Sequence, residues 1–445
     1  MIEKTRSCTR WLSIALTQLV ASAALAQPLS VEEMERYLTA LQRNTTPHEF
    51  TQRVAQLVDQ YPEDSSPIRL MLRATYASLL SAQDKAKEGY PIAESAWKIA
   101  SDVYGADSEI AARALAAYLD ACPGAGKAKS CEVIAMNAKN RWSGADTSRQ
   151  SSVTADVLRS VALIENYVGR PQEAIKSLDV ALSIWTREAA RNETKIRNAM
   201  NGKAVLLSNL GQDKAALDVA DTALKTFYQP GQQPNDDLVS ALRVKARALG
   251  ALGRVEEALL VSREAYDGAR KVSGDLSLNT LRAQEVVGTN LIRAGKFSEG
   301  LLEIGRAKDV VEQRFGSAST EALTLRYRYA DSLWRSGLQD EGVESLAKLV
   351  DDFQREHGEA HPQFAIFKHS LGRNQAVLGD FDSANETFKK SIALFTTLRG
   401  AGHPETLIAN VDAYAVEIER GALVPTKVVS EITDKLRSQL APNHP

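Results

Sequence analysis

The sequence is poor in the residues on which metal, redox and aromatic-rich sites depend. Its 445 residues include 3 cysteines, 6 histidines and 6% aromatic residues, and the net charge at pH 7 is −2. A nearly neutral chain without long Lys/Arg runs does not have the positive surface expected of a nucleic-acid binder. The chain is too long for one compact core. Few aromatic residues and many small apolar ones favour closely packed helices.

No catalytic signature stands out. The sequence contains no glycine-rich phosphate loop after a strand, and no segment has a convincing strand pattern. His357 and His361 are four residues apart, a spacing that could hold a metal on one helix face. His361 precedes Pro362, however, and a role at a helix start is the alternative. Nucleophile arrangements of the Ser/His/Asp or Cys/His type have no local signature. We therefore expect no metal, no cofactor and no enzymatic activity.

A long apolar stretch occurs only at the N-terminus. Positive residues Lys4, Arg6 and Arg10 are followed by an apolar segment, residues 11–25, that ends in Ala24-Leu25-Ala26. This is the small-x-small pattern that signal peptidase recognises. The segment is shorter than the roughly 20 apolar residues of a membrane span. We predict that residues 1–26 are a cleaved signal peptide and that the protein is exported to a periplasm or secreted. An uncleaved anchor is the alternative.

The two cysteines beyond this segment, Cys122 and Cys131, lie nine positions apart across a Gly/Pro-rich stretch. In an oxidising compartment they can form a disulfide that closes a helix–helix turn. Two buried free thiols are the alternative. Export favours the disulfide, which we predict.

Glycine marks a strict internal period of 42 residues. The glycines of this lattice are Gly169, Gly211, Gly253, Gly295, Gly337, Gly379 and Gly421. Alanine or glycine also stands seven residues before and five residues after each of the first six. A further column holds Gly274, Gly316, Gly358 and Gly400, followed three residues later by Ser277, Ser319, His361 and His403. Apolar residues between the columns follow helical spacing. The pattern predicts helical hairpins with a glycine after each first helix, where positive φ is wanted, and small residues where helices cross closely.

These columns resemble the tetratricopeptide repeat, and the 42-residue period resembles its kinesin-light-chain type. Two segments, 358–362 and 400–404, match that family's Gly-x-x-His-Pro junction between units. The resemblance implies an all-α fold, a right-handed superhelical solenoid of stacked antiparallel helix hairpins. It also implies that the first helix of each hairpin lines a concave face, where a protein or peptide binds.

The expected organisation has five segments. After the signal peptide, residues 27–64 form an N-terminal capping helix pair, with capping boxes at Ser30/Glu33 and Thr46/Glu49. Residues 65–150 form divergent hairpins and 151–402 form regular 42-residue units. Residues 403–445 form a degenerate C-terminal capping hairpin, in which Pro425 stands where the last helix should begin.

Two clusters on the expected concave face are candidates for partner binding. The first contains Asn198, Asn201, Arg243, Arg247 and Arg282. Asparagine can hold a peptide backbone and arginine can bind a carboxylate with two hydrogen bonds, so this cluster resembles the carboxylate clamp of some tetratricopeptide domains. A solvated polar face is the alternative. The second cluster contains Tyr327, Trp334 and Arg335, because aromatic residues and arginine are enriched in binding hot spots. Trp334 could equally pack between helices.

We therefore expect an exported scaffold or adaptor that binds a protein or peptide, with no nucleic-acid partner and no membrane span after cleavage. An architectural subunit of an envelope complex is the first alternative, and a hydrolase on a helical-repeat scaffold is the second. The sequence leaves the partner and the oligomeric state open.

Overall fold

The computed structural model describes residues 29–61, 63–83, 85–144, 150–229, 231, 233–359 and 361–439. Within these ranges the chain forms twenty α-helices, α2 to α21, and no strand. The predicted all-α repeat fold is confirmed. The predicted signal peptide lies outside the described residues.

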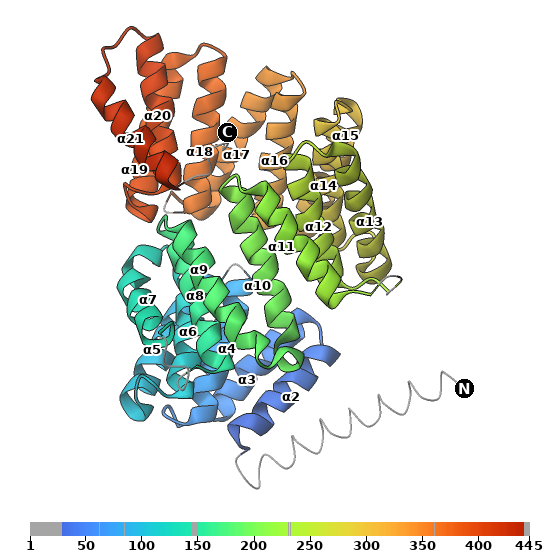
Figure 1. Ribbon diagram of the computed structural model, residues 1–445, viewed down its shortest axis with the longest axis vertical. Helices are drawn as coiled ribbons and strands as arrows, with labels where there is room; N and C mark the ends of the chain where they lie inside the picture. The colour runs from blue at the N-terminus through green and yellow to red at the C-terminus, as the bar shows by residue number, and fades with distance from the viewer. Residues whose placement is uncertain are drawn as a thin grey trace. The chain divides into compact units, whose positions relative to one another are not determined.

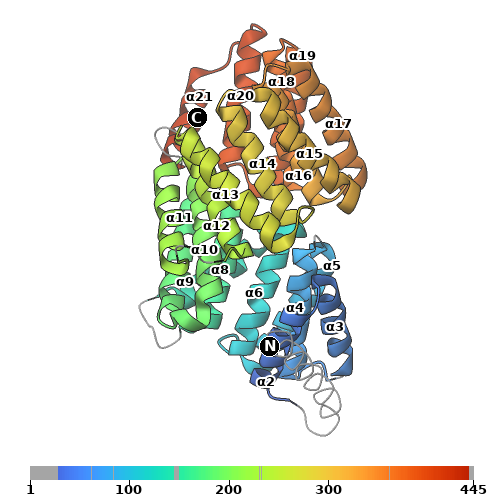
Figure 2. The same cartoon turned by 90° about the vertical axis from the view of Figure 1, so that its right-hand side faces the viewer.

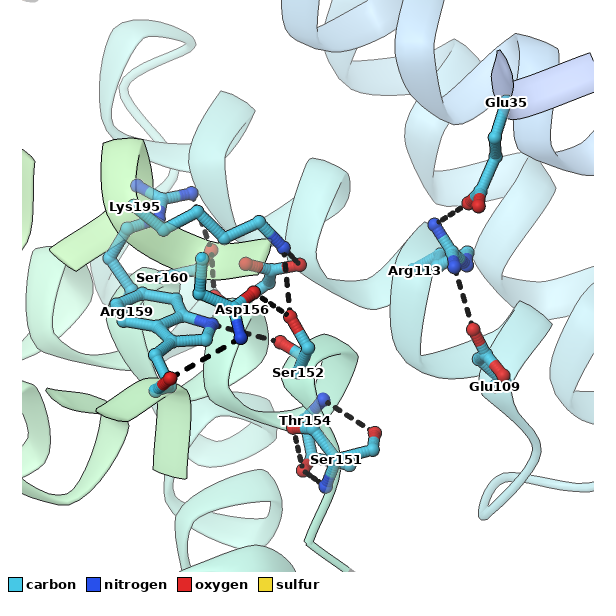
Figure 3. Close-up of polar contacts among 12 residues, drawn as sticks. Glu35, Glu109, Arg113, Ser151, Ser152, Thr154, Asp156, Arg159, Ser160 and Lys195 are labelled. Carbon is cyan, nitrogen blue, oxygen red and sulfur yellow. Dashed lines mark hydrogen bonds and ion pairs between the residues drawn. The ribbon is translucent and has the colours of Figure 1, made fainter. Parts of the chain in front are cut away.

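The chain divides into two compact units, and the division falls between Tyr118 and Leu119, inside α6. The helices of unit 1 are α2 (Val31–Asn44), α3 (Pro47–Gln60), α4 (Pro67–Ala82), α5 (Ala86–Tyr104) and the first part of α6 (Glu109–Gly124). Ser30 and Thr46 form the two predicted capping boxes at the starts of α2 and α3. Arg113 of α6 pairs with Glu35 of α2 and, at 2.6 Å, with Glu109 (Figure 3).

Unit 2 continues with α7 and then with hairpins whose first helices carry even numbers (Figures 1 and 2). Its helices are α7 (Ala128–Trp142), α8 (Ser152–Tyr167), α9 (Pro171–Thr186), α10 (Ala189–Asn209), α11 (Asp213–Phe227), α12 (Asp236–Ala251), α13 (Val255–Ser273), α14 (Leu278–Arg293), α15 (Phe297–Phe315), α16 (Thr320–Arg335), α17 (Gln339–His357), α18 (Pro362–Val377), α19 (Phe381–Arg399), α20 (Pro404–Glu419) and α21 (Thr426–Gln439).

The glycine lattice has the predicted role. All seven lattice glycines have positive φ, between 69° and 85°, in the turn between the two helices of a hairpin. The small columns lie at close helix crossings, as Gly288 and Gly300 show. A Cβ on Gly288 would approach the Gly300 carbonyl oxygen to 2.8 Å, and a Cβ on Gly300 would approach the Gly288 carbonyl oxygen to 2.7 Å. Larger side chains would force the two axes apart.

The junctions between hairpins use the second pair of columns. Ser277, Ser319, His361 and His403 each cap the start of a first helix by accepting a hydrogen bond from a backbone N–H group. This confirms the helix-start role for His361. Polar side chains also link neighbouring hairpins: Lys195 of α10 lies 2.7 Å from Asp156 of α8 (Figure 3).

The predicted disulfide is present. Cys122 lies in the last turn of α6 and Cys131 in the first turn of α7, and both are fully buried. The bond ties the end of α6 to the start of α7 across a short turn.

The array curves toward its first helices. First helices of successive hairpins contact each other directly, as in α10 with α12, α12 with α14, α14 with α16 and α18 with α20. The second helices of successive hairpins make at most marginal contact in the described chain. We call the surface of α10, α12, α14, α16 and α18 on this side the inner face.

Unit 2 also closes on itself. The turn after α8 meets the junction before α20: a Cβ on Gly169 would lie 2.7 Å from the Cα of His403. The guanidinium of Arg399 lies over the ring of Tyr167, 5.6 Å from its centroid, and α7 packs against α19. We call this contact the clasp.

His403 is a buried titratable group at the centre of the clasp, with 5% of its surface exposed. Its Nδ1 accepts the backbone N–H of Glu405 at 3.1 Å, and its ring also bonds the backbone of Asn166. Burial, with a contribution from Arg399, lowers the pKa of His403 to about 3. The folded protein therefore favours the neutral ring.

We expect the His403 contribution to stability to depend on pH. With a folded pKa of about 3 and an ordinary value of 6.5, it is fully present above pH 6.5 and decreases as the pH falls toward 3. The slope is at most about 1.4 kcal/mol per pH unit. Serine caps the equivalent helix in other repeats, so His403→Ser should keep the cap. Between pH 7 and pH 5 this variant should lose less unfolding free energy than the unmodified protein does. His361→Ser is the matched control. Equal pH dependence in His403→Ser and the unmodified protein would contradict this assignment.

Candidate functional site

A cavity of about 380 Å³ opens on the inner face between α10, α12, α14 and α16. We call it the Arg243 cavity. Its polar and charged lining residues are Asn201, Ser240, Arg243, Arg247, Arg282, Glu285, Glu321 and Thr324, and its apolar ones include Val205, Leu278 and Leu325. The lining comes from four successive first helices because these helices lie close together on the inside of the curve.

The structure brings together four of the five residues in the first predicted cluster. Asn201, Arg243, Arg247 and Arg282 line the Arg243 cavity. Asn198 lies one turn before Asn201 on α10, is exposed, and is not among the residues that line the cavity.

Two of the three arginines already have carboxylate partners. Arg247 pairs with Glu285 at 2.6 Å, and Arg282 pairs with Glu321 at 2.9 Å. Glu285 is only 4% exposed. Burial alone would raise its pKa, but Arg247 and Arg328 outweigh burial and hold the pKa of Glu285 below its ordinary value. Arg247 therefore stabilises a buried charge within the protein.

Arg243 is the exception. Among the described residues no carboxylate pairs with it, and its enclosed Nε has no hydrogen-bond acceptor. Burial, together with Arg247 and Arg282, lowers the pKa of Arg243 to about 10, so the group is still charged at neutral pH. The enclosed Oδ1 of Asn201 has no donor either. A cavity with one unpaired guanidinium and one free amide oxygen is suited to an anionic group that also carries an N–H donor.

A second cavity, of about 570 Å³, lies farther along the inner face at α14, α16 and α18, and all three members of the second predicted cluster line it. We call it the Trp334 cavity. Tyr327 is partly structural: its hydroxyl lies 3.0 Å from Ser370 Oγ and its ring stacks on Phe367. Trp334 is half-buried in the wall, beside Phe297 and Val377, which are 43% and 66% exposed.

Sequence reasoning missed Arg293, which also lines the Trp334 cavity. It is the last residue of α14 and lies outside the columns chosen for the concave face. A signal was nevertheless present at Gly250, three residues before lattice Gly253, because Arg293 lies against this glycine. Glycine within a helix lowers helix stability and calls for a local reason.

Other predicted features have plain structural roles. His357 donates from Nε2 to the carbonyl oxygen of Ala318 at 2.6 Å. In the described parts of the chain, no group of three or more His, Cys, Asp or Glu side chains is arranged to hold a metal ion. No helix among the described residues is both long enough and apolar enough to cross a membrane.

Comparison with known proteins gives similarity to solved structures only. No protein-family model matches the chain, and no curated protein matches it. The apo form of the quorum sensor NprR from B. thuringiensis is 16% identical, with a TM-score of 0.48, over 82% of this chain and 97% of that one. A Rap protein complexed with competence and sporulation factor is 13% identical, with a TM-score of 0.47, over 83% and 99%. A putative kinesin light chain from Podosopora anserina with nearly identical TPR-like repeats is 17% identical, with a TM-score of 0.37, over 46% and 96%.

The tetratricopeptide-like character of this chain rests on its own hairpins. They combine a 42-residue period, turn glycines with positive φ and close crossings at small residues.

Replacing Arg243 and replacing Arg247 should have opposite effects on stability. Arg247→Met leaves the buried Glu285 without its nearest partner and should lower the unfolding free energy by about 1–3 kcal/mol. Arg243→Met removes an enclosed charge that repels its neighbours, and should leave the unfolding free energy unchanged or raise it. Urea unfolding of both variants at pH 7 tests this. A similar loss in both would show that Arg243 has a structural role.

Proposed function

We propose that this protein is a scaffold or adaptor that binds a segment of another protein along the inner face, with an acidic group of the partner held at Arg243. The observation that carries the proposal is the unpaired guanidinium of Arg243 inside a cavity whose other arginines are neutralised. Burying a charge without a partner is costly, and a bound carboxylate would supply the missing counter-ion and accept hydrogen bonds.

The surroundings support a protein segment as the ligand. The Arg243 cavity has apolar walls at Val205, Leu278 and Leu325, and the Trp334 cavity adds exposed apolar and aromatic surface on the same face. Recognition sites of this kind combine a few aromatic or arginine anchors with surrounding contacts that exclude water. The second predicted cluster, Tyr327, Trp334 and Arg335, contributes such a surface in this proposal.

The experiment is capture of the partner with matched variants. The tagged protein is crosslinked in its native compartment and purified, and bound proteins are identified by mass spectrometry. We expect one stoichiometric partner with the unmodified chain, and at least a tenfold lower yield with Arg243→Met, since charge-assisted hydrogen bonds are lost.

Arg263→Met is the control, because Arg263 is exposed on α13 of the same hairpin and does not line the Arg243 cavity. Equal yields with all three proteins would remove Arg243 from the binding surface. Consistent recovery of the unmodified protein alone would reject stable partner binding.

We propose further that the protein acts after export. The N-terminal sequence supports this, and the buried Cys122–Cys131 bond suits an oxidising compartment. Intact-mass measurement of the protein from its native compartment should give a chain that begins at Gln27 and is two hydrogens lighter than its reduced form. A chain that retains residues 1–26, or one with two alkylatable thiols under denaturing conditions, would contradict export or the disulfide respectively.

A further inference from the structure

A second arginine without a carboxylate partner among the described residues, Arg293, lies on the inner face beside a helical glycine. Arg293 of α14 lies against Gly250 of α12, where a Cβ would fall 2.5 Å from Arg293 Nη1 and 2.4 Å from Asn290 Oδ1. Nη1 of Arg293 donates to Oδ1 of the fully buried Asn290 at 3.2 Å. The missing side chain at position 250 therefore lets Arg293 lie across α12, and Asn290 holds it there.

Arg293 has no carboxylate partner among the described residues, although the arginines around it do. Arg335 pairs with Asp331 at 2.8 Å, and Arg247 pairs with Glu285 at 2.6 Å. Burial, followed by repulsion from Arg335 and Arg247, lowers the pKa of Arg293. Arg293 thus resembles Arg243 in having a defined position and a charge that no carboxylate among the described residues neutralises, although its side chain is more exposed than that of Arg243.

Arg243 and Gly250, the residue that Arg293 contacts, lie on the same face of α12. Arg243, Arg247 and Gly250 are spaced by four and three residues, which places them on one face of the helix. Seven residues separate Arg243 from Gly250, or about 10 Å along the axis at 1.5 Å per residue. Between the two ends lies the neutral Arg247–Glu285 pair.

We infer that Arg243 and Arg293 form two seats for carboxylates of one acidic protein segment, which lies beside α12. The inference rests on the proposed function and specifies the partner's chemistry. An extended chain advances about 3.3 Å per residue, so about three residues span the two seats. The partner should carry an acidic residue at each end of that span. Its middle residues should be uncharged, because the Arg247–Glu285 pair between the seats is already neutral.

The test is selection from a displayed library of random dodecapeptides on the folded protein. We expect enriched peptides to share two Asp or Glu residues three positions apart. With Arg293→Met as the selecting protein, one of the two acidic positions should lose its preference, and Arg293→Lys should partly restore it.

Gly250→Ala provides a variant that displaces Arg293 without replacing it. The added Cβ collides with two side chains, Asn290 at Oδ1 and Arg293 at Nη1, and with no backbone atom, so the fold should be retained. We expect Gly250→Ala to lower the affinity of a selected peptide by roughly tenfold to a hundredfold, as Arg293→Met does. Gly305→Ala is the control, because this helical glycine in α15 has no neighbour closer than 3.4 Å to an added Cβ.

A double-mutant cycle tests whether Arg293 binds one particular acidic residue of the peptide. The acidic peptide residue whose preference depends on Arg293 is changed to its amide. With the unmodified protein this change should lower the affinity by the same factor as Arg293→Met does. With Arg293→Met it should lower the affinity little further. Full additivity would overturn the inference.

The remaining outcomes separate the inference from the proposed function. Selected peptides without an acidic pair would reject the two-seat arrangement and leave peptide binding intact. Failure to select any peptide would reject both. Displacement of the peptide by inorganic phosphate at much lower concentration than by acetate would assign the seats to phosphoryl groups instead of carboxylates.

Discussion

A helix hairpin cannot bury its own apolar faces, so each hairpin of this protein must be covered by its neighbours. The close crossing of Gly288 and Gly300 shows how this need is met: main chain meets main chain where a side chain would separate the helices. Repeated every 42 residues, the same crossing sets the stacking order, brings the first helices together and curves the array. The inner face is the surface of the first helices on the inside of this curve.

Stacking also determines which charges meet. Arg247 and Glu285 are 38 residues apart in sequence but occupy neighbouring first helices, and their pair neutralises a carboxylate that the array has buried. The carboxylates that line the two cavities, Glu285, Glu321 and Asp331, are each paired with an arginine. Among the described residues no carboxylate pairs with Arg243 or Arg293, and the burial and like-charge repulsion that lower their pKa values are a cost to the folded chain. A bound acidic segment would remove that cost, which links the stability of the free protein to its affinity for a partner.

Individual residues show how far sequence reasoning reached. It identified the turn glycines, the helix-start role of His361, both N-terminal capping boxes and the Cys122–Cys131 bond, because each depends on a few neighbouring residues. It placed Arg243 and Arg282 on the inner face through the repeat columns, but it could not distinguish the paired Arg282 from the unpaired Arg243. It missed Arg293, whose position depends on a glycine in the preceding hairpin, and it did not foresee that Gly169 meets His403.

The sequence by itself determined the repeat, its period, its turn glycines and the small residues at the close helix crossings. These properties arise from interactions over one hairpin, where helical periodicity, caps and turn glycines act over a few residues. Only the tertiary structure decided which arginines keep a free charge, where the cavities lie and that the array closes through the clasp. Those features depend on residues 38 to more than 200 positions apart in the sequence, and their pairing is determined by the way the hairpins between them stack.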